Sequence, residues 1–321
     1  MANEPTKPSA ADGTTSRYRS HATPPDPGAV RRVAAFAAGA PFTALVAAVE
    51  VAVVTVALGV PRSTAPIAVG LIAFSVYAAD HVADAEGDAG STPLRAQFAL
   101  RYADQLMVAA AVSYGLAVAL AAGAGPAALA LVLVPGAVWI GYATDWLPAV
   151  GDLLAPLGAV SVPRLKDVFL LNSAAVALAW AVAVVAAPLA FAEVPVDSVG
   201  PTTVALLFGY VLARSFVDVE VPNVRDAAAD AARGVATLPV VCGVAGTRRV
   251  LLGVDAVAAG LLALTAATGA ASPAALAALG VGLAVSVTVT ALAERLDGTT
   301  LGVAPDSSYL VAGGVLLALG L

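Results

Sequence analysis

The sequence contains nine long apolar segments, and this feature constrains the fold more than any other. A helix needs about 20 mostly apolar residues to cross a bilayer. The segments cover residues 33–60, 65–88, 100–122, 126–147, 166–191, 201–222, 249–269, 273–293 and 306–321. We therefore predict an all-α, polytopic membrane protein with nine transmembrane helices.

The composition supports a membrane protein. Only 12% of the 321 residues are charged and the mean hydropathy is +0.90, whereas soluble domains carry about 25% charged residues. The net charge is −6, and the basic residues form no patch suited to nucleic acid. Residues 1–30 are polar and rich in Pro, Ser and Thr. We expect a disordered tail there and one transmembrane domain over residues 31–321.

The distribution of Lys and Arg predicts the orientation. Cytoplasmic loops of membrane proteins carry an excess of these residues. If the N-terminus is cytoplasmic, fourteen of the sixteen basic residues lie on that side, Arg214 lies within a segment, and Arg62 alone lies outside. This bias supports nine segments, a multi-pass protein of the cell membrane, and a cytoplasmic N-terminus.

Two rows of acids close the second and sixth segments. Asp80, Asp84 and Asp88 follow each other at four-residue spacing, and Asp226 and Asp230 repeat that spacing. On a helix, residues four apart share a face, and crowded carboxylates repel unless a cation joins them. Such oxygen ligands suit Mg²⁺, which binds a few carboxylates together with a substrate phosphate.

The interval between the two rows is four segments. It suggests an internal duplication, with two four-helix repeats and a ninth helix added. Repeats of this kind place their site at the repeat interface. Both rows then fall on the predicted cytoplasmic side.

Basic and amide side chains accompany the two rows. Bidentate Arg is well shaped for phosphate, so acids with nearby cations suggest a metal-bridged diphosphate site. Asn223 adds a neutral oxygen ligand one turn before Asp226. The candidate cations are Arg95, Arg164, Lys166, Arg225 and Arg233.

The scarcity of cysteine and histidine excludes several kinds of site. Cys242 is the single cysteine, and His21 and His81 are the two histidines. A disulfide, a thiolate metal cage, a His-based metal site and a Ser-His-Asp triad are therefore not expected.

The motifs and the segment count resemble the UbiA superfamily of intramembrane prenyltransferases. That family has nine transmembrane helices and two Asp-rich motifs, the first commonly Asn-xxx-Asp-xxx-Asp, where Asp80 stands for the Asn. The second motif continues through Arg233 and Gly234 to Thr237-Leu-Pro, as in the family. Arg164-Leu-Lys166-Asp167 and Tyr142 also resemble family positions, and the resemblance covers residues 33–321.

The resemblance implies Mg²⁺-dependent transfer of a polyprenyl group from its diphosphate to a lipophilic acceptor, such as a lipid, quinone or carotenoid precursor, at the membrane. Asp84, Asp88, Asp226 and Asp230 would bind Mg²⁺, and Asp80 would join them as a catalytic acid. The substrate-binding residues would be Arg95, Tyr142, Arg164, Lys166, Asn223 and Arg233.

Other classes of membrane protein explain part of the pattern. A transporter with intramembrane acids for cation or proton coupling explains repeats and buried charge, but not two acid rows at one membrane face. An alcohol phosphatidyltransferase would need one compact motif that is absent here. An inactive family member with a scaffolding role is a further alternative.

Overall fold

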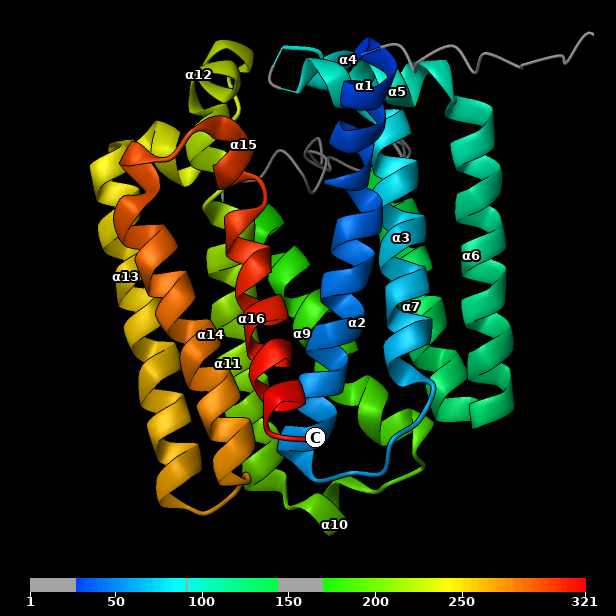
Figure 1. Cartoon of the computed structure of the whole chain (residues 1–321), viewed down its shortest axis with the longest axis vertical. Helices are drawn as coiled ribbons and strands as arrows, with labels where there is room; N and C mark the ends of the chain where they lie inside the picture. The colour runs from blue at the N-terminus through cyan, green and yellow to red at the C-terminus, as the bar shows by residue number, and fades with distance from the viewer. Residues whose placement is uncertain (1–26, 91, 144–169) are drawn as a thin grey trace, which may run out of the picture.

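The structure is a computed structural model that describes residues 27–90, 92–143 and 170–321. Its helices stand side by side in one upright bundle (Figure 1). Within these residues, nine helices have 15 or more residues. They are α2 (Ala40–Leu58), α3 (Ala65–Ala83), α6 (Ala103–Ala124), α7 (Pro126–Ala143), α9 (Leu171–Phe191), α11 (Pro201–Glu220), α13 (Leu238–Ala267), α14 (Pro273–Leu292) and α16 (Ala304–Ala318).

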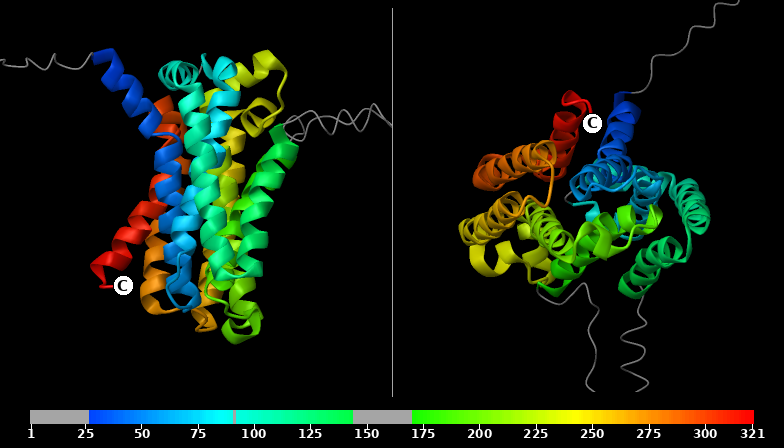
Figure 2. Two further views of the ribbon diagram at one scale, coloured as in Figure 1. Left: turned by 90° about the vertical axis from the view of Figure 1, so that its right-hand side faces the viewer. Right: turned by 90° about the horizontal axis from the view of Figure 1, so that it is seen from below.

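These helices form a closed ring. Each helix packs against the next one in chain order, and the last helix, α16, packs against the first, α2. The view along the bundle shows this arrangement (Figure 2, right). The predicted duplication would place the first repeat at α2 to α7 and the second at α9 to α14, with α16 added.

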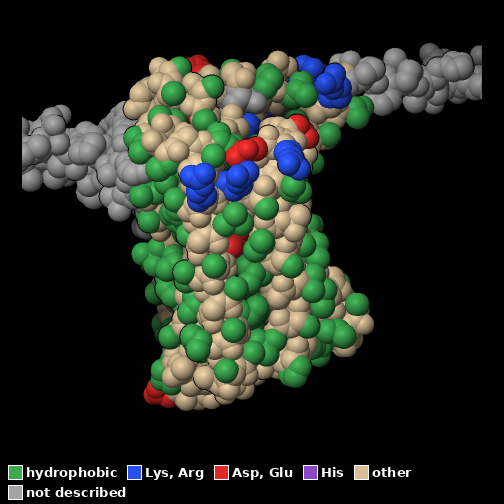
Figure 3. Space-filling model, turned by 90° about the vertical axis from the view of Figure 1, so that its left-hand side faces the viewer, with side chains coloured by type: hydrophobic (Ala, Val, Ile, Leu, Met, Phe, Trp, Pro, Cys, Tyr) green, Lys and Arg blue, Asp and Glu red, His purple; other side chains and the backbone are tan. Residues whose placement is uncertain are grey.

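Seven stretches of helix in the described residues are long and apolar enough to cross a membrane. Helix α16, at 15 residues, and helix α7 are not among them, so the count of nine spans stays a prediction. The described part of the chain contains helices and the links between them, and no strand, as expected. On the face shown in Figure 3, apolar side chains are spread along the length of the bundle, whereas Lys and Arg gather near one end.

Local sequence sets the helix ends. Proline occupies the first turn of α2, α3, α11, α13, α14 and α16, where its missing N–H costs no hydrogen bond. Helix α13 begins before the predicted segment because a short helical stretch from Leu238 joins the long apolar helix at a kink. The kink lies at Gly243, whose φ of 69° favours glycine. A close crossing also needs a small residue, since a Cβ on Gly70 would lie 3.0 Å from the Ala44 carbonyl oxygen.

Short helices cover the end of the bundle that carries the acid rows (Figure 1). Helices α1 and α5 pack on each other there through the stacked rings of Phe36 and Phe98. The short helices at this end are α1 (Pro27–Ala37), α4 (Ala85–Asp88), α5 (Pro93–Arg101), α12 (Asn223–Arg233) and α15 (Gly298–Leu301). Helix α10 (Val196–Val199) lies at the opposite end.

Candidate active site

The first acid row spans a helix break rather than one continuous helix. Helix α3 ends at Ala83, Asp84 follows it, and Asp88 ends the short helix α4. The backbone keeps helical spacing across the break, because Asp84 N–H bonds the Asp80 carbonyl and Asp88 N–H bonds the Asp84 carbonyl, both at 2.9 Å. The three acids therefore keep their spacing of one turn.

Arg95 on α5 closes this row. Its Nη2 donates a hydrogen bond of 2.8 Å to Oδ2 of Asp88, and both side chains are partly exposed. The turn between α4 and α5 brings together two residues that are seven apart in sequence. Asp88 thus already has a cationic partner that can also reach an anionic ligand.

The second row lies on α12, beyond the end of α11. Arg225 binds Asp226 with two hydrogen bonds, of 2.9 Å from Nε and 2.6 Å from Nη2. Asp230 is 7% exposed and Thr237 Oγ1 lies 3.5 Å from its Oδ2. The Asn223 amide donates to Glu220 at 3.1 Å, so that the amide nitrogen is engaged and only the oxygen could serve a metal.

Arg225 links the two rows. Its pKa is raised, chiefly by the hydrogen bond to Asp226 and then by the negative charges of Asp226, Asp88 and Asp230, while burial opposes this rise. Asp88 therefore lies within electrostatic reach of the second row. Gly298 of α15 leaves room for the Arg225 stem, because a Cβ there would lie 3.0 Å from Arg225 Cγ.

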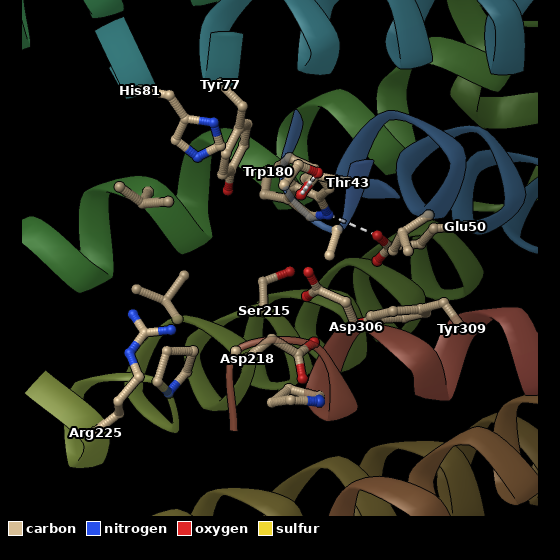
Figure 4. Close-up of a pocket in the computed structure, with 18 of the residues that line it drawn as sticks. Thr43, Glu50, Tyr77, His81, Trp180, Ser215, Asp218, Arg225, Asp306 and Tyr309 are labelled. Carbon is tan, nitrogen blue, oxygen red and sulfur yellow. Dashed lines mark hydrogen bonds between the residues drawn. The ribbon is translucent and has the colours of Figure 1, made fainter. Parts of the chain in front are cut away.

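A cavity of about 240 Å³ extends from Arg225 into the bundle. One end holds Arg95, Arg225 and His81. The other end is acidic and carries Glu50 from α2, Asp218 from α11 and Asp306 from α16. Figure 4 shows Arg225 and His81 on one side and Glu50 and Asp306 on the other. It also shows the hydrogen bond from Trp180 Nε1 to Glu50 Oε2, which is 2.6 Å long.

A buried guanidinium lies beside the acidic end. Arg214, 1% exposed, contacts Asp218 on its own helix at 3.4 Å and Asp255 on α13 at 3.6 Å. It also donates to Ser286 on α14 and to Ser308 on α16. Arg214 therefore joins four helices, and its donors are directed at this network.

Comparison with known proteins identifies the fold. No protein-family model and no curated protein matches the sequence. A solved UbiA homologue from Aeropyrum pernix is 15% identical and superposes with a TM-score of 0.65, over 88% of this chain and 98% of that chain. This chain has the UbiA fold.

Two further UbiA-fold structures, both from Archaeoglobus fulgidus, carry ligands. The homologue bound to DMAPP and Mg²⁺ is 16% identical, with a TM-score of 0.53 over 86% of this chain and 96% of that chain. The one bound to GPP and Mg²⁺ is 15% identical, with a TM-score of 0.56 over 88% and 99%. Structural similarity at this low identity establishes the UbiA fold, whereas the activity remains to be proposed.

The structure describes some of the predicted site residues and not others. Arg164 and Lys166 lie outside the described residues. Tyr142 on α7 and Arg233 on α12 lie in described helices, but their side chains are not described. Among the described residues no group of three His, Cys, Asp or Glu side chains is arranged to hold a metal ion.

Three cavity residues were not predicted as site residues from the sequence. Trp180, Glu50 and Asp306 belong to none of the sequence motifs from which the site was predicted. Glu50 could have been found, because a lone acid inside an apolar span usually marks a functional cavity. Asp306 stands in the first turn of α16, where an acid also has a plain helix-dipole explanation.

Proposed function

We propose that this protein is an Mg²⁺-dependent intramembrane prenyltransferase. One observation carries the proposal: Arg225, which lines a cavity inside an apolar bundle, is hydrogen-bonded to Asp226, and the negative charges of Asp88 and Asp230 add to the rise of its pKa. These acids belong to two rows four helices apart in the chain. The UbiA homologues bound to Mg²⁺ and DMAPP or GPP support it. The fold gives no support to the transporter alternative.

The donor set suits Mg²⁺. Carboxylate oxygens, which this hard cation prefers, come from Asp84, Asp88, Asp226 and Asp230. Two of these carboxylates accept hydrogen bonds from guanidinium groups in the structure, Asp88 from Arg95 and Asp226 from Arg225. We infer that these four residues hold the ion and that Asp80 supports them. Bound there, Mg²⁺ would withdraw charge from the leaving diphosphate.

The protein's own residues then have distinct tasks. Arg95 and Arg225 neutralise diphosphate oxygens, as their paired N–H groups suit phosphate. Arg164, Lys166, Arg233 and Tyr142 are further proposed contacts of the diphosphate. The bond between prenyl C1 and the diphosphate oxygen breaks, and the electron pair leaves with the diphosphate. A lipophilic acceptor forms the new bond to C1 within the cavity, and the proton that the acceptor loses passes to a cavity carboxylate such as Asp218.

The excess of Lys and Arg at one end of the described bundle supports a cytoplasmic active site in the cell membrane. The apolar prenyl chain would lie among the helices or in the surrounding lipid. We propose that the tail of residues 1–30 lies on the same side.

Purified membranes can test the activity. With Mg²⁺, labelled geranyl or geranylgeranyl diphosphate and a panel of acceptors, the wild-type protein should release diphosphate. EDTA or the Asp226→Asn substitution should abolish the release. The Glu294→Gln variant, which alters an exposed ion pair with Arg248, is the matched control. Folded wild-type protein that releases no diphosphate from either donor contradicts the proposal.

A further inference from the structure

Glu50 presents a bare carboxyl oxygen to the cavity. The residue is 1% exposed, and Trp180 fixes the carboxyl group through its Oε2. Its other oxygen, Oε1, has no hydrogen-bond partner among the described residues. A buried polar atom without a partner costs about 1–3 kcal/mol, so Oε1 is a strong candidate to meet a ligand.

Ser215 adds a second unsatisfied group on the same cavity. Its side chain comes from α11 and is 3% exposed, and its Oγ also has no partner in the described part of the chain. Figure 4 shows Ser215 between the Trp180–Glu50 pair and Asp218. The two bare oxygens face one space from two different helices.

The charge of this end of the cavity limits what can fill the space. Glu50, Asp218 and Asp306 line it, and Asp218 shares the buried Arg214 with Asp255. A ligand carboxylate would bring another negative charge into this group and could donate no hydrogen bond. A hydroxyl can donate to a carboxylate and accept from Ser215, so it suits both bare oxygens.

We propose that Glu50, Ser215, Asp218 and Asp306 form the acceptor-head site and that they select an uncharged, hydroxyl-bearing acceptor over a carboxylate-bearing one. The proposal rests on the proposed prenyl transfer. The cationic end, with Arg95 and Arg225, takes the diphosphate, and the acidic end takes the acceptor. The same cavity then binds the diphosphate by charge at one end and the uncharged acceptor head by hydrogen bonds at the other.

Binding to the purified full-length protein tests the proposal directly. The probes are a monoalkylglycerol and the fatty acid of equal chain length, each titrated with Mg²⁺ and the unreactive analogue geranylgeranyl thiodiphosphate present. We expect the monoalkylglycerol to bind at least about tenfold more tightly, the effect of roughly 1.4 kcal/mol. Equal affinity, or tighter binding of the fatty acid, overturns the proposal without any variant.

Substitutions assign the effect to the site. Glu50→Met should weaken monoalkylglycerol binding about tenfold, whereas Asp306→Asn should narrow the preference by improving fatty-acid binding. Glu294→Gln should change neither affinity. Unchanged affinities in folded Asp306→Asn and Glu50→Met proteins contradict the site.

The thiodiphosphate separates this proposal from the proposed function. Its Mg²⁺-dependent binding is measured in the same samples and should survive both cavity substitutions. If the analogue never binds but the glycerol preference holds, prenyl transfer fails and the hydroxyl site stands. If the analogue binds and the preference for the glycerol is absent, the proposed hydroxyl site fails and the proposed prenyl transfer stands.

Discussion

Arg225 and Asp226 are neighbours in sequence and are joined by two hydrogen bonds of 2.9 and 2.6 Å. Consecutive side chains on a helix do not usually face each other. Here the guanidinium folds over its neighbour, with its stem against Gly298. The pair is only partly buried, with side-chain exposures of 18% and 20%, so Arg225 can turn toward an arriving anion.

The first prediction concerns this pair. Arg225→Lys keeps the charge but loses the planar pair of donors that suits phosphate. We expect KM for the prenyl diphosphate to rise at least about tenfold, the effect of one charge-assisted hydrogen bond of roughly 1.5–3 kcal/mol. Steady-state kinetics at saturating Mg²⁺ check this, with Arg248→Lys as the control. An unchanged KM would remove Arg225 from the donor site.

The second prediction concerns the buried Arg214. Arg214→Met leaves Asp218 and Asp255 without their cation, and removing one partner of a buried ion pair costs about 3–5 kcal/mol. Unfolding of the protein in mixed micelles should show this loss. Arg248→Met, which breaks the exposed contact of 3.0 Å with Glu294, should cost at most about 1 kcal/mol. Equal losses in the two variants would contradict the role of Arg214.

The third prediction concerns the contact between Gly39 and His81. A Cβ on Gly39 would lie 2.7 Å from His81 Cε1, and His81 is buried. Gly39→Ala should therefore destabilise the protein by about 1–3 kcal/mol, as overpacking does. Adding His81→Ala should recover part of that loss in a double-mutant cycle.

A matched glycine provides the control for this crowding. Gly115 lies within α6, and a Cβ there meets no atom within 4 Å. Gly115→Ala should leave the stability unchanged or raise it by up to about 1 kcal/mol, because alanine is the better helix former. A loss of stability as large as that of Gly39→Ala would indicate that the surrounding bilayer, and not the contact with His81, causes the destabilisation.

The fourth prediction concerns ligand-linked stability. A ligand at about 100 times its Kd stabilises the folded state by roughly 2.7 kcal/mol. Mg²⁺ with geranylgeranyl thiodiphosphate should therefore raise the unfolding midpoint of the wild-type protein, and EDTA should reverse the rise. Asp226→Asn should show little shift. A rise that is independent of Mg²⁺ would contradict a metal-bridged site.

The sequence predicts the architecture well, because each segment carries its own evidence of apolar length. The boundaries of α11 and α14 agree with the predicted 201–222 and 273–293 within two residues. Helix α13 begins earlier than the predicted segment. Thr237 and Pro239 are typical of a helix start before Gly243, but a prediction from apolar length does not use them.

The acid rows could be predicted from sequence, whereas the meeting of the cavity-wall residues could not. The rows repeat a local spacing, so the sequence itself shows them. Glu50, Trp180 and Asp306 meet only because α2, α9 and α16 are neighbours in the ring, and no local pattern records that. The same holds for Arg225, whose relation to Asp88 depends on the placement of α12.

The bond between Glu50 and Trp180 has a consequence for how the protein is made. The two residues are 130 positions apart, and ribosomes add about 5–20 residues per second. Glu50 is thus synthesised roughly 7–26 seconds before the indole that fixes it, and α16, which completes the ring beside α2, is made after both. During that interval the first long apolar helix carries an acid without the hydrogen-bond donor that later fixes it, and an acid at membrane depth is costly.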